Sequence, residues 1–382
     1  MKKVLIVASV ISFIEWFNQE NILFLQKELG CEVHVACNLD YMDDTDVNRT
    51  VAYVEQSGKD GIIWHNIPFD RSPLGKKNMG AYRMLRQLIN ENVFDLIHCH
   101  TPAASVYTRL AARKARKRGA TVMYTCHGFH FHNASSKKNW LIYYPIERQL
   151  SRYCDYLVTI CKEDYYRAQR FHTRNVRYIP GVGVDIKRFE SAQVDKEVYK
   201  ASIGVKGNAV MILSVGELIE RKNHEVIIKA LSIPDRRDIY YVICGKGPLK
   251  EYLVKLSEEL KVKERVIFLG FRQDIPELCK TADIGAFPSK IEGLGLAGIE
   301  LMAAGIPLIA SNIHGILDYV KNGVTGYACP PDDADAFASA IVKLTDDPDL
   351  RKKMKDPCQK AVRQFDKTHA LNAMWKIYKE VL

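Results

Sequence analysis

Long apolar runs are missing from this sequence. No stretch reaches the roughly 18 to 20 apolar residues that a membrane-spanning helix needs. Met1–Lys3 and the apolar run Val4–Ile14 imitate the start of a secretion signal, but Glu15 and Trp16 follow without a small-residue cleavage site. We therefore expect this run to form a first core strand.

Paired cysteines, early glycines and repeats are also missing. The 10 cysteines include no Cys-x-x-Cys pair, and several lie in apolar runs, so we expect small buried side chains in a reducing compartment. Val7–Phe13 contains no glycine, whereas a nicotinamide dehydrogenase needs Gly-x-Gly-x-x-Gly after its first strand. Modules that recognise nucleic acid are absent, which argues against a nucleic-acid partner. Low-complexity tracts and short repeats are absent too.

The size and charge of the chain indicate a two-domain protein with anionic partners. A length of 382 residues is comfortable for two domains. Lys and Arg total 55 against 45 for Asp and Glu, which gives a formal charge of +10. This excess favours phosphates or an anionic membrane surface without choosing between them.

Short apolar runs alternate with longer amphipathic stretches along the whole chain, which predicts an α/β protein with parallel sheets covered on both faces. The predicted strands are Val4–Ala8, Glu32–Ala36, Ile62–His65, Leu96–Cys99, Thr121–Cys126 and Tyr156–Ile160, then Val210–Val215, Tyr240–Cys244, Val266–Leu269, Ile284–Phe287 and Pro307–Ala310.

Each half of the chain resembles a doubly wound unit. The Pro- and Gly-rich segment Ile179–Asp185 places the junction nearby, so we expect domains at 1–188 and 189–366. Residues 367–382 form an amphipathic helix that we expect to cross back to the first domain. Open parallel sheets bind ligands at the carboxyl ends of their strands, so two facing sheets would share an interdomain cleft.

The most informative segment runs from Phe287 to Pro307. A strand ends, a loop with Gly293, Leu294 and Gly295 follows, and a helix begins, so backbone amides there can bind a phosphate. Glu292 lies in the loop and Glu300 eight residues later, where two carboxylates can accept hydrogen bonds from different sugar rings. A loop charge and a solvated helix residue would be the plainer interpretation.

A second segment follows the strand Val210–Val215. Gly216 turns the chain, and Arg221 and Lys222 precede a helix that starts near Asn223. Arg provides a planar bidentate clamp and Lys a mobile charge, a combination that suits a departing diphosphate. An exposed basic loop is the alternative.

Together these motifs resemble glycosyltransferase family 4, the retaining enzymes with the GT-B architecture of two facing Rossmann-like domains. The resemblance rests on Gly216 with Arg221-Lys222, on Gly245-Lys246-Gly247-Pro248, and on the Glu292-x7-Glu300 stretch with its Gly-x-Gly and Ala-Gly-x-Pro tail. His127-Gly128-Phe129-His130-Phe131 and Tyr144-Pro145-Ile146-Glu147 resemble the branch that builds bacterial exopolysaccharides and capsules.

The resemblance implies roles for particular residues. Arg221 and Lys222 would bind the donor diphosphate, and Glu292 the hydroxyls of the donor sugar, near the amides of 293–295. Glu300 would hold the ribose. The backbone around Phe271 and Arg272 would meet the nucleobase, and His127, after the strand Thr121–Cys126, would face the reacting sugar. The resemblance also implies that no metal or other cofactor is needed.

The sequence departs from the family after the first strand. Many members carry a Gly-Gly loop there, whereas this chain has Ser9-Val10-Ile11-Ser12-Phe13-Ile14. A phosphate contact from this loop is therefore in doubt, and either a more apolar acceptor entrance or a packed loop is expected.

Histidines cluster in His98-Cys99-His100 and around His127. Strand alternation places His98 and His100 on one side and Cys99 on the other, which weakens a tetrahedral zinc site.

A basic run without acids follows the strand Leu96–Cys99. It reads as one helix whose Arg109, Arg113 and Arg116 share a face, with Lys114, Lys117 and Arg118 adding charge. Docking on an anionic membrane and a solvated helix face are both open interpretations.

The leading hypothesis is a metal-independent hexosyltransferase that moves GlcNAc, GalNAc or a related hexose from a UDP-sugar to a lipid-linked or glycan acceptor. We expect it in the cytoplasm, on the inner face of the cell membrane, in cell-surface polysaccharide synthesis. The alternatives are a UDP-sugar epimerase of similar fold and an inactive scaffold of a polysaccharide complex.

Overall fold

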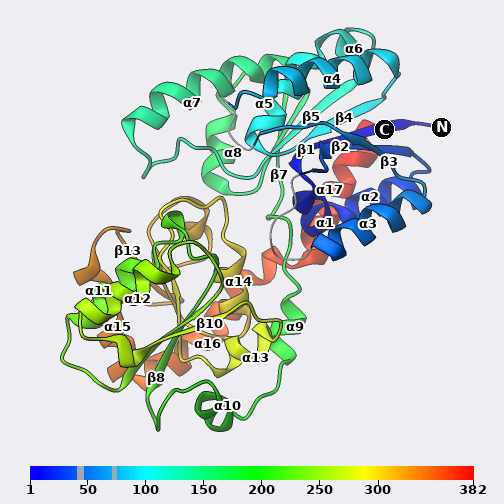
Figure 1. Ribbon diagram of the computed structural model, residues 1–382. Coiled ribbons are helices and arrows are strands. Elements are labelled where there is room, and N and C mark those ends of the chain that lie inside the picture. Colours follow the sequence, from blue (N-terminus) through cyan, green and yellow to red (C-terminus); the bar gives the residue numbers. More distant parts are fainter. Residues whose placement is uncertain (41–46, 71–74) are drawn as a thin grey trace. The chain divides into compact units, whose positions relative to one another are not determined.

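The apolar runs predicted as strands form two separate parallel sheets, one in each of two units (Figure 1). The computed structural model describes residues 1–40, 47–70 and 75–382. Unit 1 comprises Met1–Val182 with Thr368–Leu382, and unit 2 comprises Gly183–Lys367.

Unit 1 contains a parallel sheet whose described strands follow the order β3-β2-β1-β4-β5-β6-β7. Its strands are β1 (Lys3–Val10), β2 (Glu32–Asn38), β3 (Ile63–Asn66), β4 (Leu96–Cys99), β5 (Thr121–Cys126), β6 (Tyr156–Thr159) and β7 (Asn175–Tyr178). Its helices are α1 (Ile11–Phe17), α2 (Gln19–Lys27), α3 (Val47–Lys59), α4 (Asn78–Glu91), α5 (Pro102–Ala111), α6 (Arg113–Lys117), α7 (Lys137–Leu150), η1 (Ser151–Tyr153) and α8 (Lys162–Ala168).

Unit 2 repeats the same plan, with the strand order β10-β9-β8-β11-β12-β13. Its strands are β8 (Val210–Val215), β9 (Ile239–Cys244), β10 (Val266–Gly270), β11 (Ile284–Phe287), β12 (Leu308–Ser311) and β13 (Gly326–Cys329). Its helices are α9 (Ile186–Ser191), α10 (Lys196–Ser202), η2 (Glu220–Lys222), α11 (His224–Ser232), α12 (Lys250–Glu259), η3 (Lys263–Arg265), α13 (Ile275–Thr281), α14 (Leu296–Ala303), η4 (His314–Asp318), α15 (Ala334–Asp346), α16 (Pro348–Val362) and η5 (Arg363–Phe365).

Two strands escaped the sequence prediction. Asn175–Tyr178 and Gly326–Cys329 both lie at the edge of a sheet and are partly exposed. An edge strand buries less of its surface than a central one, so it needs no continuous apolar run. The predicted central strands have Val- and Ile-rich residues buried on both faces, and the predicted strands β3 and β10 lie at sheet edges as well.

The C-terminal helix α17 (Lys367–Val381) packs on unit 1. Trp375 stacks on Phe24 of α2 with ring centroids 4.5 Å apart, and Tyr378 is buried with its hydroxyl 2.9 Å from His98 Nδ1 of β4. Helices α4 and α5 cover the opposite face of this sheet (Figure 1). The two helical layers leave the carboxyl ends of the strands as the open edge.

Candidate functional site

Two loops of unit 2 meet at the carboxyl ends of the neighbouring strands β8 and β11. The first loop carries Arg221 and Lys222 in the short helix η2, and the second carries Glu292. A backbone hydrogen bond joins the two loops, in which Lys290 N–H donates to Arg221 O at 2.7 Å. Asn223, in a left-handed conformation at φ 56°, adds a bond from Nδ2 to Pro288 O at 3.0 Å. The backbone itself thus brings the predicted residues together.

The charges of these loops converge on one oxygen atom. Glu292 Oε1 accepts hydrogen bonds from Arg221 Nη1 at 3.2 Å, from Ser289 Oγ at 3.0 Å and from Lys222 Nζ. Lys222 Nζ also lies 5.2 Å from the centroid of the Phe287 ring, a cation–π contact. A carboxylate therefore occupies the place where two cations would receive another anion.

The start of α14 is built around a glycine. Gly295 precedes the helix at φ 84°, and a Cβ there would lie 2.4 Å from Phe287 Cε1. The buried Tyr319 hydroxyl donates to Leu294 O at 3.0 Å, which fixes the loop. Among the residues that the structure describes, no acceptor is found for the backbone N–H groups of Gly293, Leu294 and Gly295. These groups are available to an anionic ligand.

Glu300 lies one turn into α14 and is half-buried. Burial raises the pKa of this carboxyl to about 7, although Arg188 works in the opposite direction. Within the described ranges, the Glu300 carboxyl has no hydrogen-bond or ion-pair partner. It is a free acceptor for the hydroxyl groups of a ligand.

The remaining donor-side predictions separate into backbone and packing positions. The Arg272 side chain is held by Asp274, with Nε 2.8 Å from Oδ1, so its guanidinium is already paired. Gly216 lies against the Lys222 stem, where a Cβ would be in ordinary contact at 3.5 Å from Lys222 Cδ. A Cβ on Gly245 would meet Gly216 O at 1.9 Å, so this glycine serves the packing of two loops.

Three further residues complete the site of unit 2 and were missed from the sequence. Ser289 bonds Glu292 as described, and the His314 Nδ1 atom bonds Glu292 O. Tyr319 supports the loop before α14. His314 and Tyr319 follow β12, so a search of the residues after that strand would have found them.

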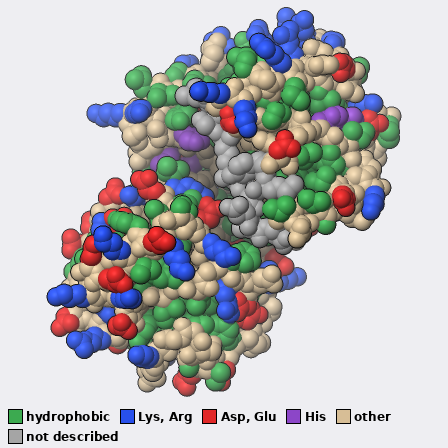
Figure 2. All heavy atoms as spheres, viewed as in Figure 1, with side chains coloured by type: hydrophobic (Ala, Val, Ile, Leu, Met, Phe, Trp, Pro, Cys, Tyr) green, Lys and Arg blue, Asp and Glu red, His purple; other side chains and the backbone are tan. Residues whose placement is uncertain are grey.

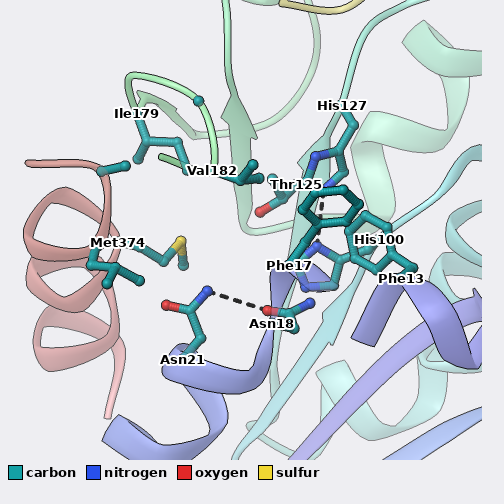
Figure 3. A pocket seen from close by; sticks show the side chains of 13 residues that line it. Phe13, Phe17, Asn18, Asn21, His100, Thr125, His127, Ile179, Val182 and Met374 are labelled. Carbon is teal, nitrogen blue, oxygen red and sulfur yellow. Dashed lines mark hydrogen bonds between the residues drawn. The ribbon is translucent and has the colours of Figure 1, made fainter. Parts of the chain in front are cut away.

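A pocket of unit 1 surrounds His127, the predicted residue at the end of β5 (Figure 3). His127 Nε2 lies 3.2 Å from Nδ1 of His100, which follows β4. The Phe13 ring packs edge-on against His127 with centroids 4.8 Å apart. Met374 of α17 and Ile179 line the other side (Figure 3).

The imidazoles of this pocket are neutral at physiological pH. Burial lowers the pKa of His127 to about 4, and burial with the neighbouring His98 and His127 rings lowers that of His100 well below its ordinary value. A neutral pair can share one proton, so each ring can present a donor or an acceptor.

Several polar atoms in this pocket have no hydrogen-bond partner among the residues that the structure describes. They are Asn18 Nδ2, Asn21 Oδ1 and His100 Nε2, all buried, while Asn21 Nδ2 donates to Asn18 Oδ1 at 3.2 Å (Figure 3). Buried polar atoms are normally satisfied, so the pocket is prepared for a hydroxyl-bearing ligand or water. Asn18 and Asn21 were missed because they lie between and within helices α1 and α2, away from any strand end.

The segment Ser9–Ile14 is not a loop. Ser9 and Val10 end β1, and Ile11 begins α1 directly. The first apolar residues of the segment extend the buried strand β1, and Ile11 and Ile14 are buried on the inner face of α1. The segment is packed as a strand end and a helix, and its Phe13 lines the pocket around His127.

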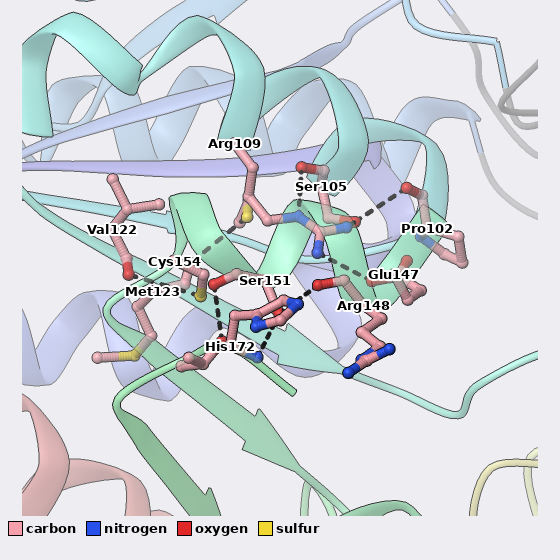
Figure 4. A network of polar contacts seen from close by, with 12 residues as sticks. Pro102, Ser105, Arg109, Val122, Met123, Glu147, Arg148, Ser151, Cys154 and His172 are labelled. Atoms are coloured by element: carbon pink, nitrogen blue, oxygen red, sulfur yellow. Dashed lines mark hydrogen bonds and ion pairs between the residues drawn. The ribbon is translucent and has the colours of Figure 1, made fainter. Parts of the chain in front are cut away.

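The basic run does not form one cationic helix. It divides at Ala112 into α5 and α6, and Arg109 is 1% exposed. Arg109 Nη1 donates to Glu147 at 2.8 Å and Nε donates to Ser105 O at 3.1 Å (Figure 4). Arg109 is therefore removed from the predicted membrane surface, because a buried cation needs a buried partner.

The other members of the basic run remain at the surface to different degrees. Arg116 is half-buried and pairs with Asp155 at 2.8 Å. The exposed residues are Arg113, Lys114, Lys117 and Arg118. Lys and Arg side chains gather over α6 at the upper rim of unit 1 (Figure 2). Among the described residues, no helix is long and apolar enough to cross a membrane.

Two Rossmann-like units, one with a cationic loop pair and the other with a neutral histidine pocket, make up the GT-B architecture. The structure of Anabaena HepE in complex with UDP and glucose superposes with a TM-score of 0.77 over 100% of both chains at 20% identity. At this identity the likeness shows the fold.

Sequence comparisons identify the family. Residues 21–188 match the model "Glycosyltransferase Family 4", and residues 195–360 match "Glycosyl transferases group 1". A Bacillus subtilis (strain 168) protein named as a putative glycosyltransferase, EpsD, is 33% identical over 99% of this chain and 96% of its own length. The chain therefore belongs to glycosyltransferase family 4.

A second relative has a more specific name. The UDP-Gal:alpha-D-GlcNAc-diphosphoundecaprenol alpha-1,3-galactosyltransferase of Escherichia coli is 30% identical over 79% of this chain and 79% of its own length. Its name specifies a UDP-sugar donor and a lipid-linked acceptor.

Proposed function

We propose that this glycosyltransferase moves a hexose from a UDP-sugar to a lipid-linked acceptor in cell-surface polysaccharide synthesis, with retention of the anomeric configuration. Unit 2 binds the donor, and the His127 pocket of unit 1 serves the acceptor and the reacting sugar. The first donors to test are those of GlcNAc, GalNAc and, from the name of the E. coli relative, galactose.

The observation that carries the donor assignment is the carboxylate of Glu292 between Arg221 and Lys222. Two cations that hold a carboxylate at 3.2 Å or less can hold the oxygens of a diphosphate in the same way. When the diphosphate displaces it, Glu292 becomes free to accept hydrogen bonds from the donor sugar. The amides of Gly293–Gly295 supply further donors to the phosphates.

The nucleoside end is assigned to the other carboxylate and to a backbone segment. Glu300 has no hydrogen-bond or ion-pair partner in the described part of the chain, which makes it an acceptor suited to ribose hydroxyls. The exposed Phe271 and the backbone beside Arg272 are open to the base.

The same charges support transfer without a metal ion. Arg221 and Lys222 stabilise the negative charge that develops on the departing diphosphate, which is the task a divalent cation performs in other transferases. We propose that the enzyme works peripherally on the inner face of the cell membrane, because a lipid-linked acceptor stays in the bilayer.

The test is a thermal-shift screen against UDP, GDP, ADP and a panel of UDP-sugars, with EDTA present. A ligand that binds the folded state raises its apparent stability. We expect a shift with UDP and one UDP-sugar, lost in Arg221→Ala. The matched control is Lys229→Ala, a cation of α11 that pairs with Glu225 outside the site.

Transfer is then measured with the shifting donor and undecaprenyl-diphosphate-linked GlcNAc, and UDP and glycolipid are both quantified. Equal amounts of each product support a transferase. An epimerised donor without a glycosylated product would show an epimerase, and no shift with any nucleotide would show a scaffold.

A further inference from the structure

Helix α7 is apolar on two opposite faces. Its sequence from Lys137 to Leu150 reads KKNWLIYYPIERQL, and most of its apolar side chains fall into two sets on opposite sides of the helix. A surface helix of a globular protein normally has one apolar stripe and one polar face. The second apolar face therefore needs an explanation.

The inner face of α7 is accounted for by the core of unit 1. Trp140, Tyr143 and Tyr144 pack against the buried hydrophobic residues of unit 1. The centroids of the Trp140 and Tyr144 rings lie 5.6 and 5.4 Å from the centroid of the Phe131 ring. Glu147 also turns inward, to the buried Arg109 (Figure 4). These contacts fix which side of the helix faces outward.

The outer face carries an exposed apolar stripe. Leu141 is 79% exposed, Ile142 40% and Ile146 42%, and Pro145 is exposed beside them. The spacing i, i+1, i+4 and i+5 places the four residues on one side of the helix. Contiguous apolar side chains on a surface mark a binding face.

Basic side chains border the stripe at both ends. Lys137 and Lys138 are exposed at its start, and Arg148 and Arg152 at its end, where Arg148 points away from the buried pair (Figure 4). The one acid of α7, Glu147, is buried against Arg109. The outward face of this helix therefore has apolar residues at its centre, cations around them and no acid.

The basic helix α6 extends this border. Arg116 Nη1 donates to Arg152 O at 2.9 Å, and the Arg113 guanidinium lies 4.5 Å from the centroid of the Tyr153 ring. Arg113, an exposed cation of α6, thus lies beside the residues that follow α7.

We propose that the outer face of α7, defined by Leu141, Ile142, Pro145 and Ile146, docks unit 1 on an anionic lipid surface. The apolar stripe enters the boundary between headgroups and acyl chains, and the flanking cations contact lipid phosphates. The proposed function enters only as the reason for docking, because a docked enzyme is held where a lipid-linked acceptor lies.

The charge pattern argues for a membrane over a second copy of this chain. A two-fold contact through α7 would bring the same basic ends of two helices together, and like charges disfavour that contact. An anionic bilayer satisfies both parts of the surface at once.

Vesicle co-sedimentation tests the proposal on the full chain without donor or acceptor. Vesicles of phosphatidylcholine with about one third phosphatidylglycerol should bind the protein, and phosphatidylcholine alone or high salt should weaken binding. Leu141→Asp with Ile146→Asp should lower the partition coefficient at least about tenfold. Lys137→Gln with Lys138→Gln should lower it about threefold to tenfold.

The matched control is Val93→Asp with Val198→Asp, which changes two exposed valines elsewhere on the chain. It should bind vesicles like the wild type. Unchanged binding in the Leu141/Ile146 variant, or equal loss in the control, would overturn the proposal. So would a dimer, measured by analytical ultracentrifugation, that only the Leu141/Ile146 variant loses.

Two readouts separate this proposal from the donor assignment. The Leu141/Ile146 variant should keep its unfolding midpoint and its UDP thermal shift. It should also keep transfer to a short-chain, water-soluble acceptor while losing transfer to acceptors in vesicles. If UDP does not raise the thermal midpoint of the wild type, the donor assignment is wrong and the docking proposal is unaffected.

Discussion

The open edges of the two units differ in their chemistry, although the two sheets have the same strand order apart from the additional edge strand β7 of unit 1. In unit 2 the residues after β8 and β11 are charged, with Arg221 and Lys222 on Glu292. In unit 1 the residues after β4 and β5 are the neutral histidines His100 and His127. The topology fixes where ligands bind, and the loops decide which ligands they are.

The difference also explains how one unit can bind a diphosphate and the other a sugar hydroxyl. A diphosphate needs positive charge, which must stay hydrated or paired until the ligand arrives. A sugar hydroxyl needs directed neutral donors and acceptors, which can be buried at low cost when they bond one another.

The largest effect is expected from the charged site. Lys222→Ala should lower kcat/KM about 10²- to 10³-fold, because it removes a cation from the leaving diphosphate. The thermal shift with UDP should fall in parallel. Steady-state kinetics and the thermal-shift titration measure both, with Lys229→Ala as the control. A variant with wild-type kinetics would remove the charged site from the mechanism.

A smaller effect is expected from the neutral pocket. His127→Ala should lower transfer about 10- to 100-fold through loss of a buried hydrogen bond, and leave the UDP shift unchanged. Since the His127 pKa is about 4, wild-type transfer should show no histidine inflection near pH 6.5. If His127→Ala weakened UDP binding as strongly as Lys222→Ala, the division between the units would be wrong.

Glu292→Gln should separate binding from transfer. Loss of the carboxylate leaves Arg221 and Lys222 unneutralised, so the UDP dissociation constant should fall about threefold to tenfold. Transfer should nevertheless fall, because an amide is a poorer acceptor for the sugar hydroxyls. Calorimetric titration with UDP checks the first expectation. Weaker UDP binding in this variant would contradict the exchange of partners proposed for Glu292.

The last effect concerns Glu300 and the dependence of stability on pH. Its folded-state pKa of about 7 lies above the ordinary carboxyl value of 4.5, so its stabilising contribution is complete below pH 4.5 and is lost as the pH rises to 7. The loss is at most about 3 kcal/mol, and less because the carboxyl is only half-buried.

Glu300→Gln should remove this pH dependence. Its thermal midpoint should exceed that of the wild type at pH 8 and approach it at pH 5. Thermal unfolding across this range, without nucleotide, provides the measurement. Parallel curves for the two proteins would show that the carboxyl is more hydrated than its burial implies.

Part of the structure followed from local patterns. Leu96–Cys99, Thr121–Cys126, Val210–Val215 and Ile284–Phe287 have the predicted bounds, since a central parallel strand must be apolar on both faces. The edge strands β7 and β13 escaped prediction because partial exposure removes that requirement. The sequence also indicated Arg221, Lys222 and Glu292, since residues after strands lie at the ligand edge.

The partners of individual side chains could not be predicted in this way, because they lie in distant segments of the chain. Arg109 reads as a surface cation in its basic run, yet it is buried by Glu147, which lies 38 residues later. Asn18 and Asn21 read as ordinary helix residues until the histidines of two strands and the side chains of α17 close a pocket around them.

Local patterns predicted the α/β class, the two doubly wound units and the ligand-bearing strand ends, because periodicity and turn chemistry act over short distances along the chain. Which charges are neutralised and which apolar faces stay uncovered could be seen only in the folded molecule. Those outcomes depend on contacts between segments far apart in sequence, as when the core uses one face of α7 and leaves Leu141 in solvent.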